Sequence, residues 1–245
     1  ADSLWLHKSF RDVMLKKNAD APLKGKKYVY SCLNFILLQQ LVEQLAGVPM
    51  DEFLTREFYR PMNLSRTAYL PLRYFRKENI VPSSVDRFLR KETLQGFVHD
   101  ESAAILGGIS GNAGLFSTAY EVSQVYQMLL NGGEYEGQRY LSKETCQLFT
   151  TETSKISRRG LGFDKPDAED VGSSPCAPSA PASVYGHTGF TGTCAWADPD
   201  NGLVYVFLSN RTYPDAWVNK LSKLEIREHI QETLYRALMQ PAPVE

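Results

Sequence analysis

The chain has 245 residues, a formal net charge of −1, 43% hydrophobic residues and 22% charged residues. This composition is ordinary for a globular protein, and one domain of this length can bury roughly 70–75% of its unfolded surface. The near-neutral charge provides no electrostatic footprint for nucleic acid, so we expect small-molecule or protein partners. The longest apolar stretch, Cys32 to Val48, is interrupted by polar residues and falls short of the ~20 residues of a membrane span.

Amphipathic segments and turns alternate in the N-terminal part. We predict a first helix from Leu4 to Lys17, a turn-rich stretch from Asn18 to Lys27 and a short extended segment, Tyr28-Val29-Tyr30. Ser31 suits the N-cap of the next helix, which Gly47 and Pro49 end. Leucine and isoleucine recur in that helix at helical spacing, which predicts one core-facing side. Its members are Leu33, Ile36, Leu37, Leu41 and Leu45.

The middle of the chain predicts shorter elements. Asp51 would cap a helix that ends at Pro61, and residues 68–98 read as loop with short strands. A glycine-rich stretch, 107–114, precedes a helix from Ala119 to Leu130. The inner face of that helix would hold Val122, Val125, Tyr126 and Leu129. Ser142 opens another helix, and the Ser, Pro and Ala content of Ser173 to Ser183 indicates a mobile surface loop.

The C-terminal part has the clearest pattern. Val184 to Phe190, Thr193 to Ala197 and Leu203 to Leu208 predict antiparallel strands, and Asn201-Gly202 marks a hairpin turn. A final helix is predicted from about Ala216 to Met239. We therefore predict an α+β fold, an antiparallel sheet with flanking helices, in which residues 1–245 form a single domain.

Two short boxes stand out as candidates for chemistry. Tyr30-Ser31-Cys32 directly precedes an amphipathic helix, and His187-Thr188-Gly189 ends a strand before a tight turn. Each box alone is weak, because such triplets are common by chance. Together with their flanks they resemble the serine β-lactamase-related family of class C β-lactamases, D,D-peptidases and esterases. The matching flanks are Tyr30-Ser31-x-x-Asn34-x-x-x-Leu38, Phe58 to Leu64 with Thr67, Ala113 to Thr118 and Gly186 to Gly192.

The resemblance runs from about Tyr28 to the C-terminal helix. It looks closest to a β-lactamase-like domain that some bacteria append to a family 3 glycoside hydrolase, with support from Val98 to Glu101 and from Arg159 to Asp164. The family performs acyl transfer with a serine in an S-x-x-K box, a second Tyr or Ser box, and a K-T-G or H-T-G strand. The resemblance thus implies a partial β-lactamase/transpeptidase-like domain.

The resemblance also assigns roles to residues. Tyr30 would be the phenol that relays the proton of the nucleophile, and a phenol that titrates near ~10 needs a nearby cation for this role. His187 would stand where many relatives have lysine and shape the field beside Tyr30. Thr188 and Gly189 would bind substrate, and the backbone N–H of Phe190 would be one oxyanion donor. Cys32 would also lie in the substrate-binding part, at the place where the family has an asparagine or aspartate that holds the catalytic lysine and the substrate carbonyl. A thiol is a poor substitute for either.

The chain contains no S-x-x-K box. In the family this box lies well upstream of the tyrosine box, so we expect a truncated domain whose nucleophile comes from a missing upstream segment. The fragment alone is then expected to be inactive. The first functional hypothesis is a serine hydrolase, periplasmic or otherwise exported, that forms an acyl-enzyme on an ester, amide or peptidoglycan-type substrate. The second is a non-catalytic module, attached to a glycosidase, that binds glycan or cell-wall fragments.

Simpler interpretations stand beside these roles. Tyr30 could be a core or rim tyrosine, His187 a satisfied strand histidine and Ser31 only an N-cap. His99-Asp100-Glu101 is more typical of a hydrogen-bonded loop than of a metal site, and Ser110 lacks the last glycine of a nucleophile elbow. The four cysteines lack metal-ligand spacing, so we expect free thiols and neither a metal nor a cofactor. They are Cys32, Cys146, Cys176 and Cys194.

Overall fold

The computed structural model describes residues 4–22, 25, 28–152 and 154–239. The chain divides into two compact units: the first comprises Ala1–Thr118 and Thr212–Trp217, the second Ala119–Arg211 and Val218–Glu245. The described elements mix helices with short antiparallel strand pairs and sheets, which confirms the predicted α+β class. None of the described helices combines the length and the apolarity that crossing a bilayer requires.

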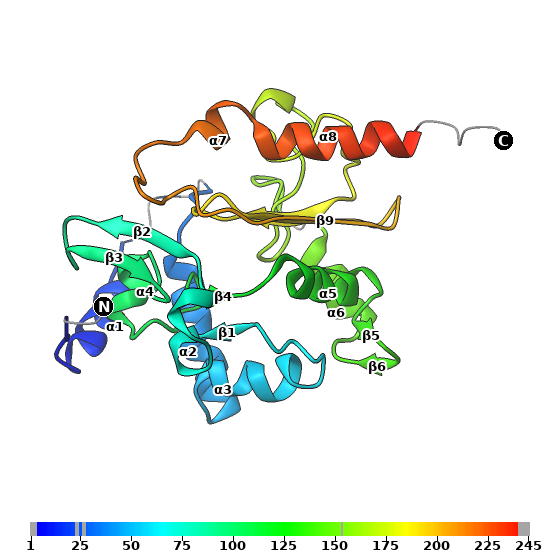
Figure 1. Ribbon diagram of the computed structural model, residues 1–245. Helices are drawn as coiled ribbons and strands as arrows, with labels where there is room; N and C mark the ends of the chain where they lie inside the picture. The colour runs from blue at the N-terminus through cyan, green and yellow to red at the C-terminus, as the bar shows by residue number, and fades with distance from the viewer. Residues whose placement is uncertain (1–3, 23–24, 26–27, 153, 240–245) are drawn as a thin grey trace. The chain divides into compact units, whose positions relative to one another are not determined.

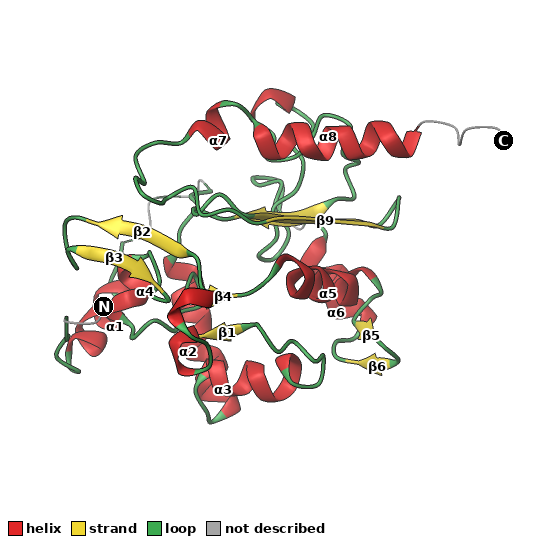
Figure 2. Cartoon of the chain, viewed as in Figure 1, coloured by secondary structure: helices red, strands yellow, loops and turns green. Residues whose placement is uncertain are grey.

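The first unit combines helices with two antiparallel strand pairs, β1–β4 and β2–β3 (Figures 1 and 2). Its elements are α1 (Phe10–Ala19), α2 (Leu33–Ala46), α3 (Met50–Leu54), the π-helix η1 (Thr55–Tyr59), β1 (Ala68–Tyr69), η2 (Pro71–Arg73), η3 (Lys77–Asn79), β2 (Pro82–Asp86), β3 (Glu92–Gln95), α4 (Glu101–Ile105) and β4 (Leu115–Phe116). The prediction of loop with short strands for residues 68–98 agrees with this order.

Helix α2 buries a side that shares only Ile36 with the predicted face. Ile36 and Gln39 are buried, whereas most of the predicted leucine face is exposed. The exposed fractions of Leu37, Leu38, Leu41 and Leu45 are 43%, 51%, 49% and 78%. The predicted face is therefore confirmed at Ile36 and wrong at Leu37, Leu41 and Leu45, although a globular helix usually turns its apolar side inward.

Hydrogen bonds of Gln39 explain this orientation. Its amide donates to the carbonyl of Ile109 (3.2 Å) and to the carboxylate of Glu43 (3.0 Å), and its oxygen accepts from the N–H of Gly111 (3.1 Å). At Gly111 a Cβ would lie 2.1 Å from the carbonyl oxygen of Phe35, so only glycine permits this approach. The glycine-rich loop therefore packs against α2 through its backbone, and the amide side of the helix must face it.

Other predictions for the first unit need correction. The first helix begins at Phe10 rather than Leu4, and Asp51 lies inside α3, whose N-cap is Pro49. Tyr28-Val29-Tyr30 belongs to neither a helix nor a strand. Part of the predicted turn stretch, Asn18 to Lys27, lies outside the described residues.

The second unit is a sheet with helices packed on it. In the described residues, β7, β8 and β9 form an antiparallel sheet in that order, and Figure 1 shows α5 and α8 on opposite faces of it. Its elements are α5 (Ala119–Leu130), β5 (Glu134–Tyr135), β6 (Gln138–Arg139), α6 (Lys143–Thr150), η4 (Val171–Ser173), β7 (Tyr185–Thr188), β8 (Cys194–Asp198), β9 (Leu203–Phe207), α7 (Lys220–Lys223) and α8 (Ile226–Met239).

Several local predictions hold in this unit. Helix α5 has the predicted bounds, and Ser142 caps α6 by accepting from the N–H of Thr145 (3.1 Å). The three strands lie where the pattern placed them, and β7 is shorter than predicted because it ends at Thr188. In the β8–β9 turn the carboxylate of Asp198 accepts two backbone N–H groups, and Gly202 takes a positive φ of 62°.

The C-terminal helix and the Ser173–Ser183 segment differ from their predictions. The helix is divided into α7 and α8, between which Glu225 has a φ of 49°. Gln231 and Tyr235 form its buried side, while Leu234 and Leu238 are exposed. Cys176, in the middle of the predicted surface loop, is buried in the core. That core cluster consists of Cys176, Val184, Cys194, Trp196 and Tyr205.

The exposure of the α2 leucines gives a test by truncation. Ile36→Ala is expected to lower the free energy of unfolding by about 2–5 kcal/mol, because it opens a cavity at a fully buried side chain. Leu41→Ala, one turn further along the same helix, is expected to change it far less. Urea unfolding of both variants measures the difference. A larger loss for Leu41→Ala would show that the leucine side is the packed one.

Candidate active site

The tyrosine box lies at the start of α2 in the first unit. Tyr30 is exposed, and Ser31 accepts the N–H of Leu33 on its hydroxyl (3.2 Å). The N-cap position itself belongs to Cys32, whose thiol makes no capping hydrogen bond and is exposed. The predicted cap at Ser31 is thus one residue early, although its hydroxyl does bind the first turn. Tyr30 and Cys32 are held by the same helix start.

The His-Thr-Gly box lies on β7 in the second unit. His187 and Thr188 are the last residues of the strand and pair with Ala195 and Cys194 of β8. Gly189 and Phe190 follow in a tight turn, in which the N–H of Gly192 donates to the carbonyl of Gly189 (2.9 Å). The structure brings these residues together on one strand and turn. Tyr30 and Cys32 lie on the other unit, so the expected effect of His187 on Tyr30 stays a prediction.

The outer edge of β7 presents backbone groups in a defined order. Gly186 exchanges two hydrogen bonds with Asp164 on the side away from β8, with lengths of 2.7 and 3.0 Å. Because backbone groups alternate sides along a strand, Thr188 points its N–H and C=O to that same outer side. Phe190 lies two residues further, in the turn, with the guanidinium of Arg211 4.5 Å from the centroid of its exposed ring.

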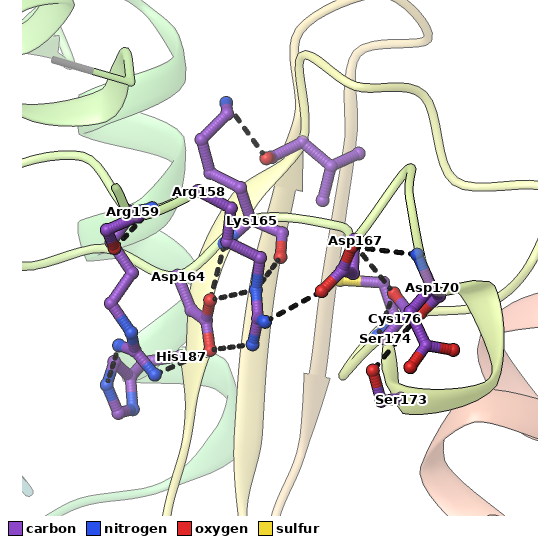
Figure 3. A network of polar contacts seen from close by, with 12 residues as sticks. Arg158, Arg159, Asp164, Lys165, Asp167, Asp170, Ser173, Ser174, Cys176 and His187 are labelled. Atoms are coloured by element: carbon purple, nitrogen blue, oxygen red, sulfur yellow. Dashed lines mark hydrogen bonds and ion pairs between the residues drawn. The ribbon is translucent and has the colours of Figure 1, made fainter. Parts of the chain in front are cut away.

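A buried carboxylate, Asp164, organises the side chains beside β7 (Figure 3). Its oxygens accept from Nε of Arg158 (2.8 Å), from Nη2 of Arg158 (3.2 Å) and from Nη2 of Arg159 (2.6 Å). Arg158 also reaches the carboxylate of Asp167 (3.1 Å). Two guanidinium groups and two carboxylates thus balance in charge, which a buried ionic group requires.

Arg159 connects this carboxylate to the candidate histidine. Its Nη1 lies 2.8 Å from Nε2 of His187 (Figure 3). Nδ1 of His187 lies 2.6 Å from the carbonyl oxygen of Thr188. Burial lowers the pKa of His187, the positive charge of Arg159 lowers it further, and the Thr188 carbonyl and Asp164 oppose the shift. The imidazole is therefore held in its neutral form at neutral pH.

Sequence reasoning missed Arg158, Asp164 and the role of Arg159 beside His187. A signal was present, because the Arg159 to Asp164 stretch supported the family resemblance. That stretch folds back so that Asp164 pairs with Gly186, the residue before His187. A contact between residues 28 positions apart leaves no periodic pattern, so only the motif could have pointed to it.

The described residues contain no group of three His, Cys, Asp or Glu side chains placed to hold a metal ion. All four cysteines are free thiols. His99-Asp100-Glu101 belongs to a hydrogen-bonded loop: Asp100 caps α4 by accepting from the N–H of Ala103 (2.7 Å), and the carbonyl of His99 accepts from Arg90 (2.7 Å). This arrangement agrees with the interpretation of the stretch as a hydrogen-bonded loop.

Comparison with known proteins decides the family. The family model described as Beta-lactamase matches residues 2–226. The chain belongs to the β-lactamase family. This β-lactamase-family chain is 34% identical over 216 residues to an Escherichia coli K12 protein provisionally named D-alanyl-D-alanine carboxypeptidase, with 82% of the chain and 49% of that protein covered. An N-acetylmuramyl-L-alanine amidase of Bacillus subtilis is 34% identical over 201 residues, with 77% and 45% covered.

Solved structures of the β-lactamase and penicillin-binding-protein fold resemble the chain. A β-lactamase from Mycobacterium bovis aligns with a TM-score of 0.59 at 17% identity over 89% of this chain and 67% of its own. A penicillin-binding protein homologue from Caulobacter crescentus aligns with a TM-score of 0.57 at 18% identity, over 82% and 59%. These likenesses show the fold. The β-lactamase-family chain spans about half the length of the curated relatives it matches.

The charge balance at Asp164 gives a test in this β-lactamase-family chain. Asp164→Asn leaves two guanidinium groups facing a neutral amide, so the free energy of unfolding is expected to fall by about 3 kcal/mol. Asp167→Asn, a matched change at a more exposed partner of Arg158, is expected to cause a much smaller loss. Urea unfolding at neutral pH compares them. Equal losses would mean that Asp164 does not organise the strand edge.

Proposed function

We propose that this chain supplies the proton-relay and strand-edge parts of a serine acyl-transfer site that acts on peptidoglycan-type peptides. The observation that carries the proposal is the His187-Thr188-Gly189 box at the end of β7, where Thr188 points its backbone N–H to the outer side of the strand. Family membership and relatives named carboxypeptidase and amidase support a cell-wall peptide or amide as substrate.

The proposed reaction forms a covalent acyl-enzyme. A serine Oγ loses its proton to the phenolate of Tyr30 and attacks the acyl carbon, and the C–N bond of the substrate breaks. The leaving amine takes the proton back from Tyr30, and water then hydrolyses the ester in the same way. The N–H of Phe190 would stabilise the developing oxyanion, while Thr188 and Gly189 align the substrate.

We further propose that the nucleophile lies on an S-x-x-K segment outside these 245 residues, since none of them form this box. The exposed leucine side of α2 supports this, because a helix normally buries such a side against the rest of its domain. Relatives that act on the cell wall also favour an exported, for instance periplasmic, location.

The role of Tyr30 is testable by labelling with a fluorescent penicillin. In a protein that joins this chain to its S-x-x-K segment, the serine is expected to be labelled, and Tyr30→Phe is expected to slow labelling by about 10²–10⁴-fold. Tyr28→Phe, two residues away and also exposed, is the matched control and should label normally.

Two outcomes would contradict parts of this proposal. Hydrolysis of a p-nitrophenyl ester by the 245 residues alone, abolished by Tyr30→Phe, would place the nucleophile within the chain. Equal labelling of Tyr30→Phe and wild type would remove Tyr30 from the relay.

A substitution at Cys32 tests the second departure from the family pattern. Cys32→Asn restores an amide at the third place of the tyrosine box, so labelling is expected to accelerate by about tenfold or more, the value of one hydrogen bond to a charged group. Cys32→Ala removes the thiol without adding an amide and serves as the control. Acceleration by alanine as large as by asparagine would exclude this role of the amide.

The second candidate function is a non-catalytic module that binds glycan or cell-wall fragments. The sequence feature that favours it is the joint absence of S-x-x-K and of an asparagine or aspartate at position 32. A folded protein with the complete domain that never labels, yet binds cell-wall fragments, would support the module over the enzyme.

A further inference from the structure

Arg159 has a place in the second unit that its family resemblance does not explain. Its side chain is 19% exposed and lies between Asp164, which is 3% exposed, and the imidazole of His187. One nitrogen of the guanidinium faces the carboxylate at 2.6 Å and the other faces Nε2 of the histidine at 2.8 Å (Figure 3). The planar guanidinium therefore contacts two partners at once from a fixed position.

The donor and acceptor roles of these contacts determine the protonation of His187. A guanidinium has only donors, so Nε2 of His187 must accept with its lone pair. The carbonyl of Thr188 has only lone pairs, so Nδ1 must carry the proton and donate (2.6 Å). A ring turned by 180° would place C–H groups against both partners, so the two contacts support the present orientation.

We propose that Arg159 is a positioning residue of this site, holding His187 as the neutral tautomer protonated on Nδ1. Asp164 holds Arg159 in turn, and the backbone pair between Asp164 and Gly186 fixes both arginine and carboxylate relative to β7. The positive charge at the His-Thr-Gly strand is then that of the guanidinium. His187 neither carries this charge nor moves a proton.

The proposal corrects the role first expected for His187. His187 was expected to stand in the place of the lysine of relatives and to shape the field beside Tyr30, whereas in this arrangement it is a neutral spacer between Arg159 and the carbonyl of Thr188. A catalytic role for this arrangement rests on the proposed acyl-transfer function, in which Tyr30 is the proton relay and His187 is not. The tautomer itself can be measured without any catalysis, so the two proposals can fail separately.

The test is two-bond ¹H–¹⁵N correlation NMR of the uniformly ¹⁵N-labelled chain at neutral pH. His187, assigned by loss of its signals in His187→Gln, is expected to show a protonated, pyrrole-like Nδ1 and an unprotonated, pyridine-like Nε2. The exposed His229 of α8 serves as the internal reference for a histidine in water. A proton on Nε2 of His187 in the wild-type protein, or on both nitrogens, would overturn the proposal.

Two arginine variants distinguish the hydrogen bond between Arg159 and His187 from the effect of removing one positive charge near Asp164. Arg159→Met is expected to release the tautomer, so that the Nε2 signal moves from the pyridine-like toward the pyrrole-like range. Arg158→Met removes the same charge from the same carboxylate. The hydrogen bonds of Arg158 go to Asp164, Asp167 and the carbonyl of Lys165, so the signals of His187 should stay as in wild type. Equal shifts in the two variants, or none in Arg159→Met, would contradict a positioning role.

If Arg159→Met does not fold, the loss of the amide signals of β8 would reveal this. A third variant, Arg159→Lys, keeps the proposal testable in that case. Arg159→Lys keeps a donor-only cation at this place, and it is expected to retain Nδ1 protonation with a weaker hold on the ring. Free exchange of the His187 tautomers to the level of His229 in a folded lysine variant would oppose the proposal. Retained Nδ1 protonation would support it.

Discussion

The ion pairs of the Asp164 carboxylate with Arg158 and Arg159 are the interaction on which the candidate strand edge depends. This carboxylate is buried and accepts from both Arg158 and Arg159, while the backbone of Asp164 pairs with Gly186 of β7. A buried carboxylate is tolerated only where its charge and lone pairs are satisfied, so the arginines and the carboxylate require one another. The ion pair with Asp164 therefore fixes the position of Arg159 beside His187, and the arginine side chain does not have to find that position independently.

Buried amides have the corresponding function for two helices. Gln39 attaches α2 to the carbonyl of Ile109 and the N–H of Gly111, and Gln231 attaches α8 by accepting the N–H of Ala177 (2.9 Å). In both helices the glutamine side faces the protein and leucines face outward. An unpaired buried backbone group costs about 1–3 kcal/mol, enough to compete with the burial of one leucine. The neighbouring loop backbone thus selects the helix face that can satisfy it.

The sequence predicts well the turns, helix caps and element bounds that depend on residues adjacent in the chain. The Asp198 to Gly202 hairpin, the cap at Ser142 and the bounds of α5 each depend on a few adjacent side chains. The leucines of α2 were wrongly predicted to be buried because the apolar period assigns leucine to the core without regard to loop carbonyls elsewhere in the chain. The prediction of a surface loop around Cys176 was wrong for a related reason. It relied on the serine and proline content of the segment, whereas the Cys176 thiol is buried in the core cluster that contains Trp196.

In the candidate site, too, adjacent residues were predicted from the sequence and contacts between distant residues were not. The His-Thr-Gly box was found because it is contiguous, whereas its charged partner Arg159 lies 28 residues earlier. This separation changes the chemistry assigned to the strand. An imidazole near its ordinary pKa would gain and lose charge across physiological pH, but a guanidinium keeps its charge throughout that range. In the arrangement proposed above, the cation beside His187 is therefore a guanidinium, whose charge does not depend on the protonation of the imidazole.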